Sequence, residues 1–331
     1  MTARILVSVT CLLFGPFGIY NADAAEAASR AANSEPTVAV KTAGGDTNAV
    51  YLFTSFDSGD QCQLRFLYSF DGRHWTNVPG SFLAAGDLPG RVFRDPSCVR
   101  GTDGTFHLVW TSGWRRNQDF GYASSKDLIH WSEPKFIPVM TNEPTTVNVW
   151  APELFYDAPR QQFIITWAST IPGRFPDHLE PHDNNHRLYY TTTRDFNSFT
   201  FTKLFFDPGF SVIDPFILQD GNRYVLVYKD NTRPVRALRV AFGTSPLGPW
   251  RDVSAPFTEG FTEGPCALKI GNDWLIYYDA YQERFYGAVK THDFRTFADI
   301  TPEVSFPEGH KHGTALRVPR EILDGLLQNK P

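Results

Sequence analysis

The stretch YSFDGRHW at residues 68–75 recurs in altered form along the chain, and this repetition decides the fold. Each copy follows a strand-like run, contains Ser or Thr with Asp or Gly in a turn, and closes on an aromatic residue. The other copies are SSKDLIHW (124–131), TTRDFNSF (192–199), TSPLGPW (244–250) and THDFRTF (291–297). Their closing aromatics, at 75, 131, 199, 250 and 297, are 56, 68, 51 and 47 residues apart. A period near 50 residues with several strands per unit is typical of propeller blades.

Strands are predicted between the copies, where β-branched and aromatic residues dominate short runs. These runs are 105–112, 162–169, 224–229 and 274–279. The first copy (51–83) has no inner strand before it, whereas HGTALRVP (312–319) is a lone strand followed by a turn or two of helix. We therefore expect an all-β, five-bladed β-propeller in which one blade is completed by N- and C-terminal segments. Pairing of these segments would hide the open sheet edges.

Composition agrees with one β-rich globular domain, although 331 residues would suggest two. The chain has 28 Phe, 13 Tyr and 8 Trp, with 25 Gly and 24 Pro spread along its length. Intrinsic disorder is excluded, because it requires few aromatics and a high net charge. The formal charge of −5 and the lack of a basic block argue against nucleic acid as a partner.

The first residues resemble an export signal. Arg4 precedes an apolar run over 5–20, and Ala-Asp-Ala at 22–24 supplies a cleavage site. The run is too short to predict a membrane span. We expect a signal peptide (1–24), a polar leader (25–36) and a single catalytic domain (37–331), exported to the periplasm or beyond the cell, not membrane-bound, and monomeric.

Three cysteines remain after such cleavage, and no CxxC spacing is present. We expect Cys62, Cys98 and Cys266 to be mostly buried small apolar residues. A disulfide between Cys62 and Cys98 stays open as an alternative.

A second series of motifs lies where the innermost strand of each blade should begin. It reads RDPS (94–97), WAPE (150–153), IDPF (213–216), TEGP (262–265) and HGT (312–314). Proline is tolerated at the start of a strand, where no ladder hydrogen bond is needed. Innermost strands surround the propeller axis, so Asp95, Trp150, Asp214, Glu263 and His312 should converge at one mouth.

Three carboxylates in one aromatic-walled pocket cannot ionise alike, because burial and repulsion raise the pKa of at least one. A protonated acid and a carboxylate on either side of a sugar are the machinery of glycoside hydrolysis. Taken singly, Asp95 and Asp214 could be ordinary turn residues. Together and in register with Glu263, they form a candidate catalytic set.

In order and spacing, these motifs resemble those of the five-bladed glycoside hydrolases of family 43 and their relatives, over residues 50–319. The resemblance implies an inverting reaction in which Asp95 is the general base and Glu263 the general acid. It implies that Asp214 orients the acid and tunes its pKa, and that Trp150 lies in the pocket wall. His312 matches a histidine that contacts a central metal ion or water. No cofactor is required, and a structural Ca²⁺ or other ion near the axis would be an accessory.

The resemblance also implies a carbohydrate substrate, with α-L-arabinofuranose or β-D-xylose residues of plant polysaccharides as the sugars removed. We favour exo action on terminal pentoses. Trp114 has two open interpretations, inter-blade core or sugar platform. The loop 171–186 carries His178, His182 and His186, but its prolines disfavour a helical metal site, so we expect it at the pocket rim.

Two other functions stay open. A retaining fructoside-type propeller hydrolase would use Asp95 as nucleophile, although its Asn-Asp-Pro-Asn and Glu-Cys elements are missing from this sequence. A non-catalytic sugar-binding propeller would have Asp95 or Glu263 pointing away from the pocket. Fold alone does not separate these from a hydrolase.

Overall fold

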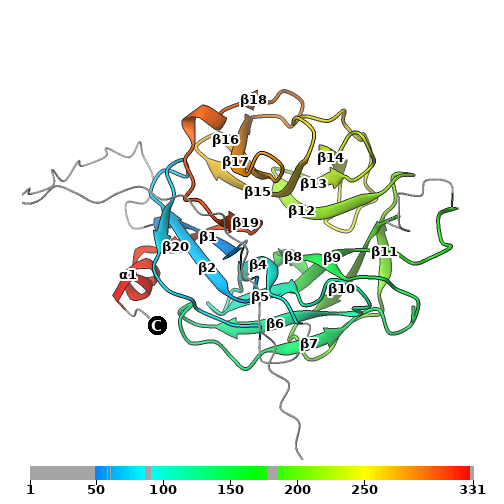
Figure 1. Ribbon diagram of the computed structural model, residues 1–331, viewed down its shortest axis with the longest axis horizontal. Helices are drawn as coiled ribbons and strands as arrows, with labels where there is room; N and C mark the ends of the chain where they lie inside the picture. The colour runs from blue at the N-terminus through cyan, green and yellow to red at the C-terminus, as the bar shows by residue number, and fades with distance from the viewer. Residues whose placement is uncertain (1–48, 58, 60, 86–90, 177–184, 329–331) are drawn as a thin grey trace, which may run out of the picture. The chain divides into compact units, whose positions relative to one another are not determined.

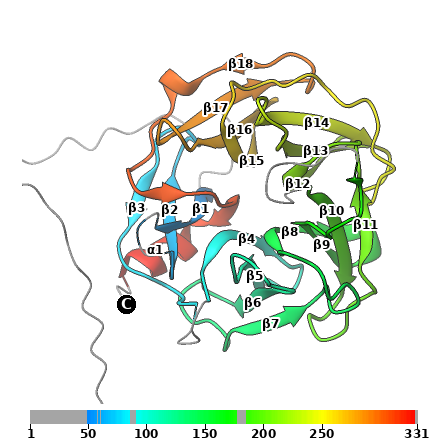
Figure 2. The same ribbon diagram turned by 45° about the vertical axis from the view of Figure 1, so that its right-hand side comes forward.

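Five small antiparallel sheets form a ring within residues 44–331 (Figures 1 and 2). The computed structural model describes residues 49–57, 59, 61–85, 91–176 and 185–328. The expected signal peptide and leader therefore lie outside the described residues. The prediction of an all-β, five-bladed propeller is confirmed.

Each sheet is called a blade here and is numbered in chain order. Blade 1 contains β1 (Ala49–Asp57), β2 (Leu64–Ser69), β3 (Thr76–Val78), β19 (His310–Lys311) and β20 (Ala315–Pro319). Blade 2 contains β4 (Arg94–Arg100), β5 (Phe106–Thr111), β6 (Asp119–Ser125) and β7 (Lys135–Pro138). Blade 3 contains β8 (Trp150–Asp157), β9 (Gln162–Ser169), β10 (Arg187–Thr193) and β11 (Lys203–Phe206).

Blade 4 contains β12 (Val212–Asp220), β13 (Arg223–Asp230) and β14 (Ala237–Gly243). Blade 5 contains β15 (Thr262–Ile270), β16 (Asp273–Ala280), β17 (Phe285–Thr291) and β18 (Ala298–Asp299). Helix α1 (Arg320–Gln328) follows β20 directly, as expected after Pro319. None of the helices in the described residues has the length and apolarity needed to cross a membrane.

Blade 1 joins segments that are about 260 residues apart in sequence. β20 pairs antiparallel with β1 from Ala49↔Pro319 to Phe53↔Ala315, and β19 continues along the same strand. Gly313 is required between them, because a Cβ there would lie 1.6 Å from the carbonyl oxygen of Thr54. The expected completion of one blade by N- and C-terminal segments is therefore confirmed.

The repeated turn has a common hydrogen-bond pattern. It lies at the end of each blade opposite the start of the innermost strand, which is called the outer end here. In blade 2, Ser125 Oγ accepts the N–H of Leu128, and Asp127 Oδ1 accepts those of Ile129 and His130. Blades 1, 3 and 5 have the equivalent bonds at Ser69/Asp71, Thr193/Asp195 and Thr291/Asp293. Side-chain acceptors of this kind fix a turn locally, which is why the motif recurs.

The hydrophobic core lies between neighbouring blades. One cluster, for example, combines Phe53 of blade 1 with Val227 of blade 4 and Tyr277 of blade 5. Fully burying one large apolar side chain contributes about 1.5–3 kcal/mol, so inter-blade packing holds the ring together. Cys98 and Cys266 are buried, and neither forms a disulfide with a described residue. Cys62 is exposed, so the expectation of burial is wrong for this residue.

Candidate active site

The innermost strands of blades 2 to 5 share one irregularity, a β-bulge followed by proline. Asp95, Ala151, Asp214 and Gly264 have φ values of 52°, 45°, 54° and 59°. The pairing with the second strand shifts register across each of these residues. Left-handed φ is strained for residues other than glycine, and bulges of this kind re-aim side chains beside active sites.

The bulge also corrects the alignment of the motifs. Ala151 and Gly264 are the structural equivalents of Asp95 and Asp214. Trp150 and Glu263 therefore lie one residue ahead of the bulge. The absence of a side chain at Gly264 leaves room for His312, because a Cβ there would lie 2.6 Å from its imidazole ring.

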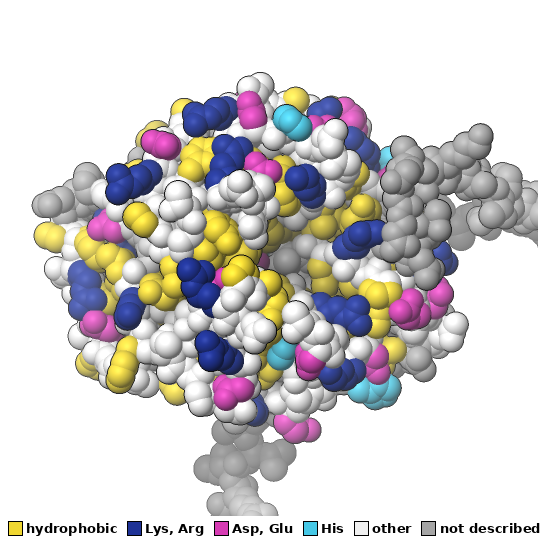
Figure 3. Space-filling view, turned by 180° about the vertical axis from the view of Figure 1, so that it is seen from behind, with side chains coloured by type: hydrophobic (Ala, Val, Ile, Leu, Met, Phe, Trp, Pro, Cys, Tyr) yellow, Lys and Arg dark blue, Asp and Glu magenta, His cyan; other side chains and the backbone are white. Residues whose placement is uncertain are grey.

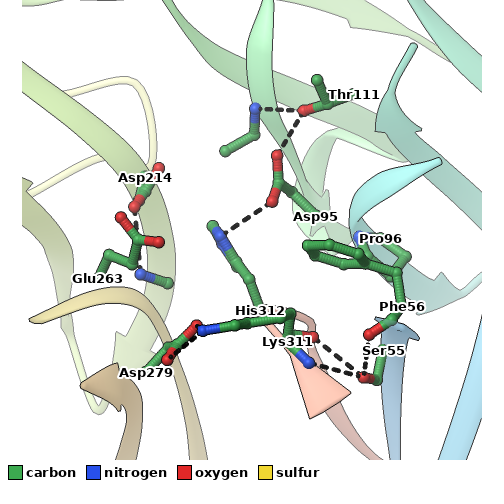
Figure 4. A network of polar contacts seen from close by, with 12 residues as sticks. Ser55, Phe56, Asp95, Pro96, Thr111, Asp214, Glu263, Asp279, Lys311 and His312 are labelled. Carbon is green, nitrogen blue, oxygen red and sulfur yellow. Dashed lines mark hydrogen bonds and ion pairs between the residues drawn. The ribbon is translucent and has the colours of Figure 1, made fainter. Parts of the chain in front are cut away.

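All the side chains expected at the mouth converge on one cavity of about 100 Å³. It is lined by Asp95, Trp114, Trp150, Asp214, Glu263 and His312, together with Arg94, Thr111 and Ile213. Figure 4 shows the three carboxylates, each from a different strand, and the imidazole of His312, between β19 and β20, arranged around a common space. With Trp150 of blade 3, residues from all five blades thus meet at one place, as the position of the motifs predicts.

Asp95 is held as a carboxylate. Thr111 Oγ1 accepts the N–H of Ala151 at 2.8 Å, so its hydroxyl proton is directed to Asp95 Oδ2 at 2.7 Å. His312 Nδ1 lies 3.2 Å from Asp95 Oδ1. Burial would raise the pKa of Asp95, but the positive charges of His312 and Arg94 and these hydrogen bonds lower it to about 2. At neutral pH this carboxylate can accept a proton from water.

Glu263 and Asp214 form a pair with opposite pKa shifts. The Nζ of Lys229, whose side chain is 1% exposed, lies 2.8 Å from Glu263 Oε2. Burial would raise the pKa of Glu263, but the charge and hydrogen bond of Lys229 outweigh it and lower that pKa. Burial and the negative charge of Glu263 raise the pKa of Asp214. With Lys229 on Glu263, Asp214 therefore binds a proton more readily than Glu263 does.

Asp214 also joins two blades. Its Oδ2 accepts the backbone N–H of Gly264 at 3.1 Å, which links the bulge of blade 4 to that of blade 5 (Figure 4). The same carboxyl group is therefore an electrostatic neighbour of Glu263 and a structural contact to the backbone beside it. This position suits a residue that orients Glu263.

His312 is cationic at the centre of the site. Burial would lower its pKa, but the charges of Asp95 and Asp214 and the hydrogen bond to Asp95 raise it to about 9. A metal ligand requires a neutral imidazole nitrogen. Among the described residues, no group of three or more His, Cys, Asp or Glu side chains is arranged to hold a metal ion. An ion at His312 stays a prediction.

A second buried ion pair adjoins the site in a cavity of about 150 Å³, which shares Arg94, Glu263 and His312 with the first. Asp279 lies opposite Glu263 in the β15–β16 pairing, and Lys311 Nζ is 2.9 Å from its Oδ2 (Figure 4). Burial and the charge of Glu263 raise the pKa of Asp279 to about 6 despite Lys311.

Two tryptophans form the wall of the cavity. Trp114 is 48% exposed, and its ring lies nearly perpendicular to that of Trp150 with 6.2 Å between centroids. Trp150 Nε1 donates to the carbonyl oxygen of Trp114 at 2.7 Å, and the Arg94 guanidinium lies 4.2 Å from the Trp114 ring. Of the two interpretations of Trp114, the exposed platform fits and the inter-blade core does not.

The histidine loop contributes from behind this wall. His178 and His182 lie outside the described residues. His186 is fully buried and stacks on Trp150, with ring centroids 5.0 Å apart. It therefore supports the wall instead of forming the rim. Burial, with nearby positive charges, lowers the pKa of His186 to about 3, so it is neutral.

Glu153, in the WAPE motif, lies close to the propeller axis. Thr314 Oγ1 of blade 1 donates to its Oε2 at 3.3 Å, and the next residue, Leu154, donates its N–H to Ser97 Oγ of blade 2. Burial raises the pKa of Glu153 to about 8. It is thus a neutral acid at a junction of three blades.

Sequence reasoning did not identify Thr111, Lys229, Asp279 and Lys311. The first three lie in β5, β13 and β16, near the site end of each second strand. The signal that could have found them is a polar residue ending an apolar strand, as in FHLVWT, RYVLVYKD and DWLIYYDA. Lys311 lies in a motif, HKHGT, of which only His312 was singled out.

Structural comparison places this propeller among known ones. A thermostable family-43 glycoside hydrolase superposes with a TM-score of 0.53 and 16% identity, covering 69% of this chain and 80% of that one. The catalytic domain of a family 62 α-L-arabinofuranosidase from Coprinopsis cinerea superposes with a TM-score of 0.51 and 14% identity, covering 78% and 77%. At these identities the likeness shows the fold alone.

Sequence comparison identifies the family. An α-L-arabinofuranosidase from Bifidobacterium longum is 25% identical over 173 residues, which are 45% of this chain and 16% of that relative's length. A family model described as a probable glycosyl hydrolase domain, related to glycosyl hydrolase family 43, matches residues 46–324. This match covers most of the chain and includes every residue of the candidate site. The chain therefore belongs to the glycosyl hydrolase 43-related family.

Proposed function

We propose that this protein is an exported, inverting, exo-acting glycoside hydrolase that removes terminal pentoses, α-L-arabinofuranose or β-D-xylose, from plant-type polysaccharides or oligosaccharides. The observation that carries the proposal is the cavity in which Asp95, Asp214 and Glu263 meet beside two tryptophans. Its volume of about 100 Å³ suits one small sugar ring, which supports removal of a terminal residue.

Asp95 acts as the general base. Its low pKa keeps it ionised, and the hydroxyl of Thr111 and the imidazolium of His312 hold its two oxygens in place. The carboxylate takes a proton from a water molecule as that water attacks the anomeric carbon. The bond to the leaving oxygen breaks as the new C–O bond forms, which inverts the configuration.

Glu263 acts as the general acid, and it must first gain a proton. In the arrangement with Lys229 on Glu263, a proton binds more readily to Asp214 than to Glu263. We infer that it passes from Asp214 to Glu263 when the sugar binds, and that Lys229 then compensates the charge of Asp214. Glu263 next donates this proton to the leaving oxygen. Asp214 thereby tunes the acid without touching the bond that breaks.

The test is hydrolysis of a panel of nitrophenyl glycosides and of matching pentose-bearing oligosaccharides, with NMR detection of the first anomer released. An α-L-arabinofuranoside should give β-L-arabinofuranose, and a β-D-xyloside should give α-D-xylose. Release of the retained anomer would instead support the fructoside-type mechanism with Asp95 as nucleophile.

The variant Glu263→Gln tests the acid. Oligosaccharides have a poor leaving group and depend on protonation, so turnover should fall by about 10³-fold, while nitrophenyl glycosides should lose less. Binding of the oligosaccharide should remain, and the exposed control Glu133→Gln should behave as wild type. Equal losses on both substrates would remove Glu263 from the acid role, and near-wild-type turnover would favour a binding propeller.

A further inference from the structure

A cavity of about 610 Å³ has a cationic lining that begins at Arg115, the residue after Trp114 of the active-site wall. Its lining residues are Arg115, Arg116, Gln118, Pro144, Thr145, Thr146 and Val147. Among the described residues, this lining contains two arginines, one glutamine and two threonines, and no acidic side chain. Its volume is in the range of pockets that hold small-molecule ligands.

The two arginines of the lining differ from Arg91 and Arg174, which form ion pairs with acidic side chains. Arg91 pairs with Asp119 at 2.6 Å, and Arg174 pairs with Glu143 at 2.8 Å close to this cavity. Arg115 and Arg116 are exposed and form no ion pair with any described residue. Glu143, the residue before Pro144 of the lining, is itself paired with Arg174. Unpaired guanidinium groups on one hollow surface favour an anionic ligand.

The walls of the cavity are fixed by backbone contacts. Arg116 N–H donates to the carbonyl oxygen of Val147 at 2.7 Å, and Gln118 Nε2 donates to that of Pro144 at 3.0 Å. The same loop is anchored at Asn117, whose Nδ2 donates to the Asp119 carbonyl oxygen at 2.7 Å. These bonds join the β5–β6 loop to the β7–β8 segment, so the arginines project from a constrained backbone.

The linings of this cavity and of the active-site cavity are adjacent in the chain. Trp114, which lines the active-site cavity, directly precedes Arg115. Its carbonyl oxygen is bound by Trp150, the second aromatic of the wall. A glycan whose terminal sugar occupies the active-site cavity can therefore extend over the tryptophans toward the arginines.

We propose that this cavity is a subsite for a uronic acid residue of the substrate, whose carboxylate pairs with Arg115 and Arg116 while the terminal pentose lies in the active-site cavity. A planar carboxylate matches the fork of a guanidinium group. Gln118 and Thr145 offer hydrogen bonds to ring hydroxyls. The inference rests on the proposed function and narrows its substrate class to acidic, uronate-bearing glycans. On the face seen from behind Figure 1, basic and acidic side chains are interspersed (Figure 3).

The experiment compares one glycan with itself after chemical change. A glucuronate- and arabinose-bearing xylo-oligosaccharide is used before and after reduction of its carboxyl group to a primary alcohol. The intact form should have at least fivefold lower KM, and this preference should fade at high salt, as expected for exposed ion pairs. The third arm is an oligosaccharide that carries a sulfate group in place of the carboxylate, and it should bind more weakly than the uronate.

Variants assign the effect to the arginines. Arg115→Gln and Arg116→Gln should each raise KM for the uronate substrate by about fivefold, and the double variant by about twentyfold. KM for the reduced substrate and for nitrophenyl arabinofuranoside should stay within twofold of wild type. The lysine variants should recover part of the preference. Arg194→Gln, an exposed change in the turn after β10, is the matched control and should change nothing.

Two outcomes overturn the subsite. One is equal KM for intact and reduced substrates in the wild type, and the other is an equal loss on both in the arginine variants. Tighter binding of the sulfated glycan would overturn the carboxylate assignment. Calorimetric binding of the intact and reduced glycans is measured in parallel, so the preference is read even without turnover. A protein that prefers the uronate but hydrolyses nothing would sink the proposed function and leave the subsite standing.

Discussion

The two ends of the propeller use aspartate in opposite ways. At the outer end, Asp127 and Asp195 accept backbone N–H groups in repeated turns, and their pKa values are lowered by local hydrogen bonds. At the site end, Asp95 and Asp214 are buried on strained bulges. Burial and the charge of Glu263 raise the pKa of Asp214, whereas the charges of His312 and Arg94 lower that of Asp95 despite its burial. The residues next to each aspartate in the sequence do not by themselves distinguish a turn aspartate from a site aspartate.

The difference teaches what each end is built for. A turn aspartate finds its partners within three residues, so its role is local and repeats from blade to blade. A bulge aspartate finds its partners 16 residues away, at Thr111, or more than 200, at His312. Only the closed ring creates that environment. The candidate site therefore lies at the end where the blades share one backbone geometry, the bulge, but have different side chains.

The largest expected effect comes from exchanging one aspartate at each end. Asp95→Asn should lower kcat by about 10³-fold, because an amide cannot take a proton from water. Asp127→Asn, which keeps an acceptor oxygen, should leave kcat within twofold. Steady-state kinetics on the same oligosaccharide measures both. Similar kcat values for the two variants would erase the proposed contrast between the ends.

Removal of Lys229 should shift the pH dependence of the reaction. In Lys229→Met, Glu263 loses the cation that lowers its pKa, so the basic limb of the kcat/KM profile should move up by about one pH unit or more. Lys229→Arg keeps the charge and should leave the limb near its wild-type position. An unmoved basic limb in the methionine variant would contradict the role of Lys229.

The buried acid at the axis should make stability depend on pH. The pKa of Glu153 is about 8 in the folded protein against an ordinary 4.5, so the folded state binds the extra proton between these values. Its contribution is complete below about pH 4.5 and is lost as the pH rises through 8. The unfolding free energy of Glu153→Gln minus that of the wild type should therefore be about 1–3 kcal/mol larger at pH 8 than at pH 4.5. Urea titrations of both proteins at both pH values measure this difference. If it is the same at pH 4.5 and pH 8, the prediction is wrong.

The smallest effect is expected at the outer end. Asp127→Ala removes the acceptor for two backbone N–H groups, which should cost about 1 kcal/mol and lower Tm by about 2–4 °C. Activity at 25 °C should be unchanged. Asp195→Ala should give the same result, since the turn is equivalent. A loss of activity in either variant would show that the two ends are coupled.

The fold could be predicted because its determinants are local and repeated. Turn motifs, strand-length runs and proline-marked strand starts each act over a few residues, and five copies make the pattern unmistakable. The completion of blade 1 followed from a missing strand at one end and a lone strand at the other. The convergence of Asp95, Asp214 and Glu263 followed from ring geometry.

The rest of the site depends on contacts that no local pattern contains. Lys229 ends a strand of blade 4 but acts on Glu263 of blade 5, and His312 meets Asp95 only through the closed ring. The bulge register was also hidden, because proline marks the strand start without stating which residue has positive φ. His186 reads as a rim histidine, and only packing reveals it behind Trp150.

The strand pairing that completes blade 1 also sets the order of events during synthesis. Residues 310–319 emerge from the ribosome after all the other propeller strands. They contain His312, which pairs with Asp95, and β20, which pairs with β1. Until they dock, the earlier blades form an open arc with an exposed sheet edge and an incomplete site. Closure of the ring and onset of catalysis are thus one event, and a chain stopped before residue 310 should be inert.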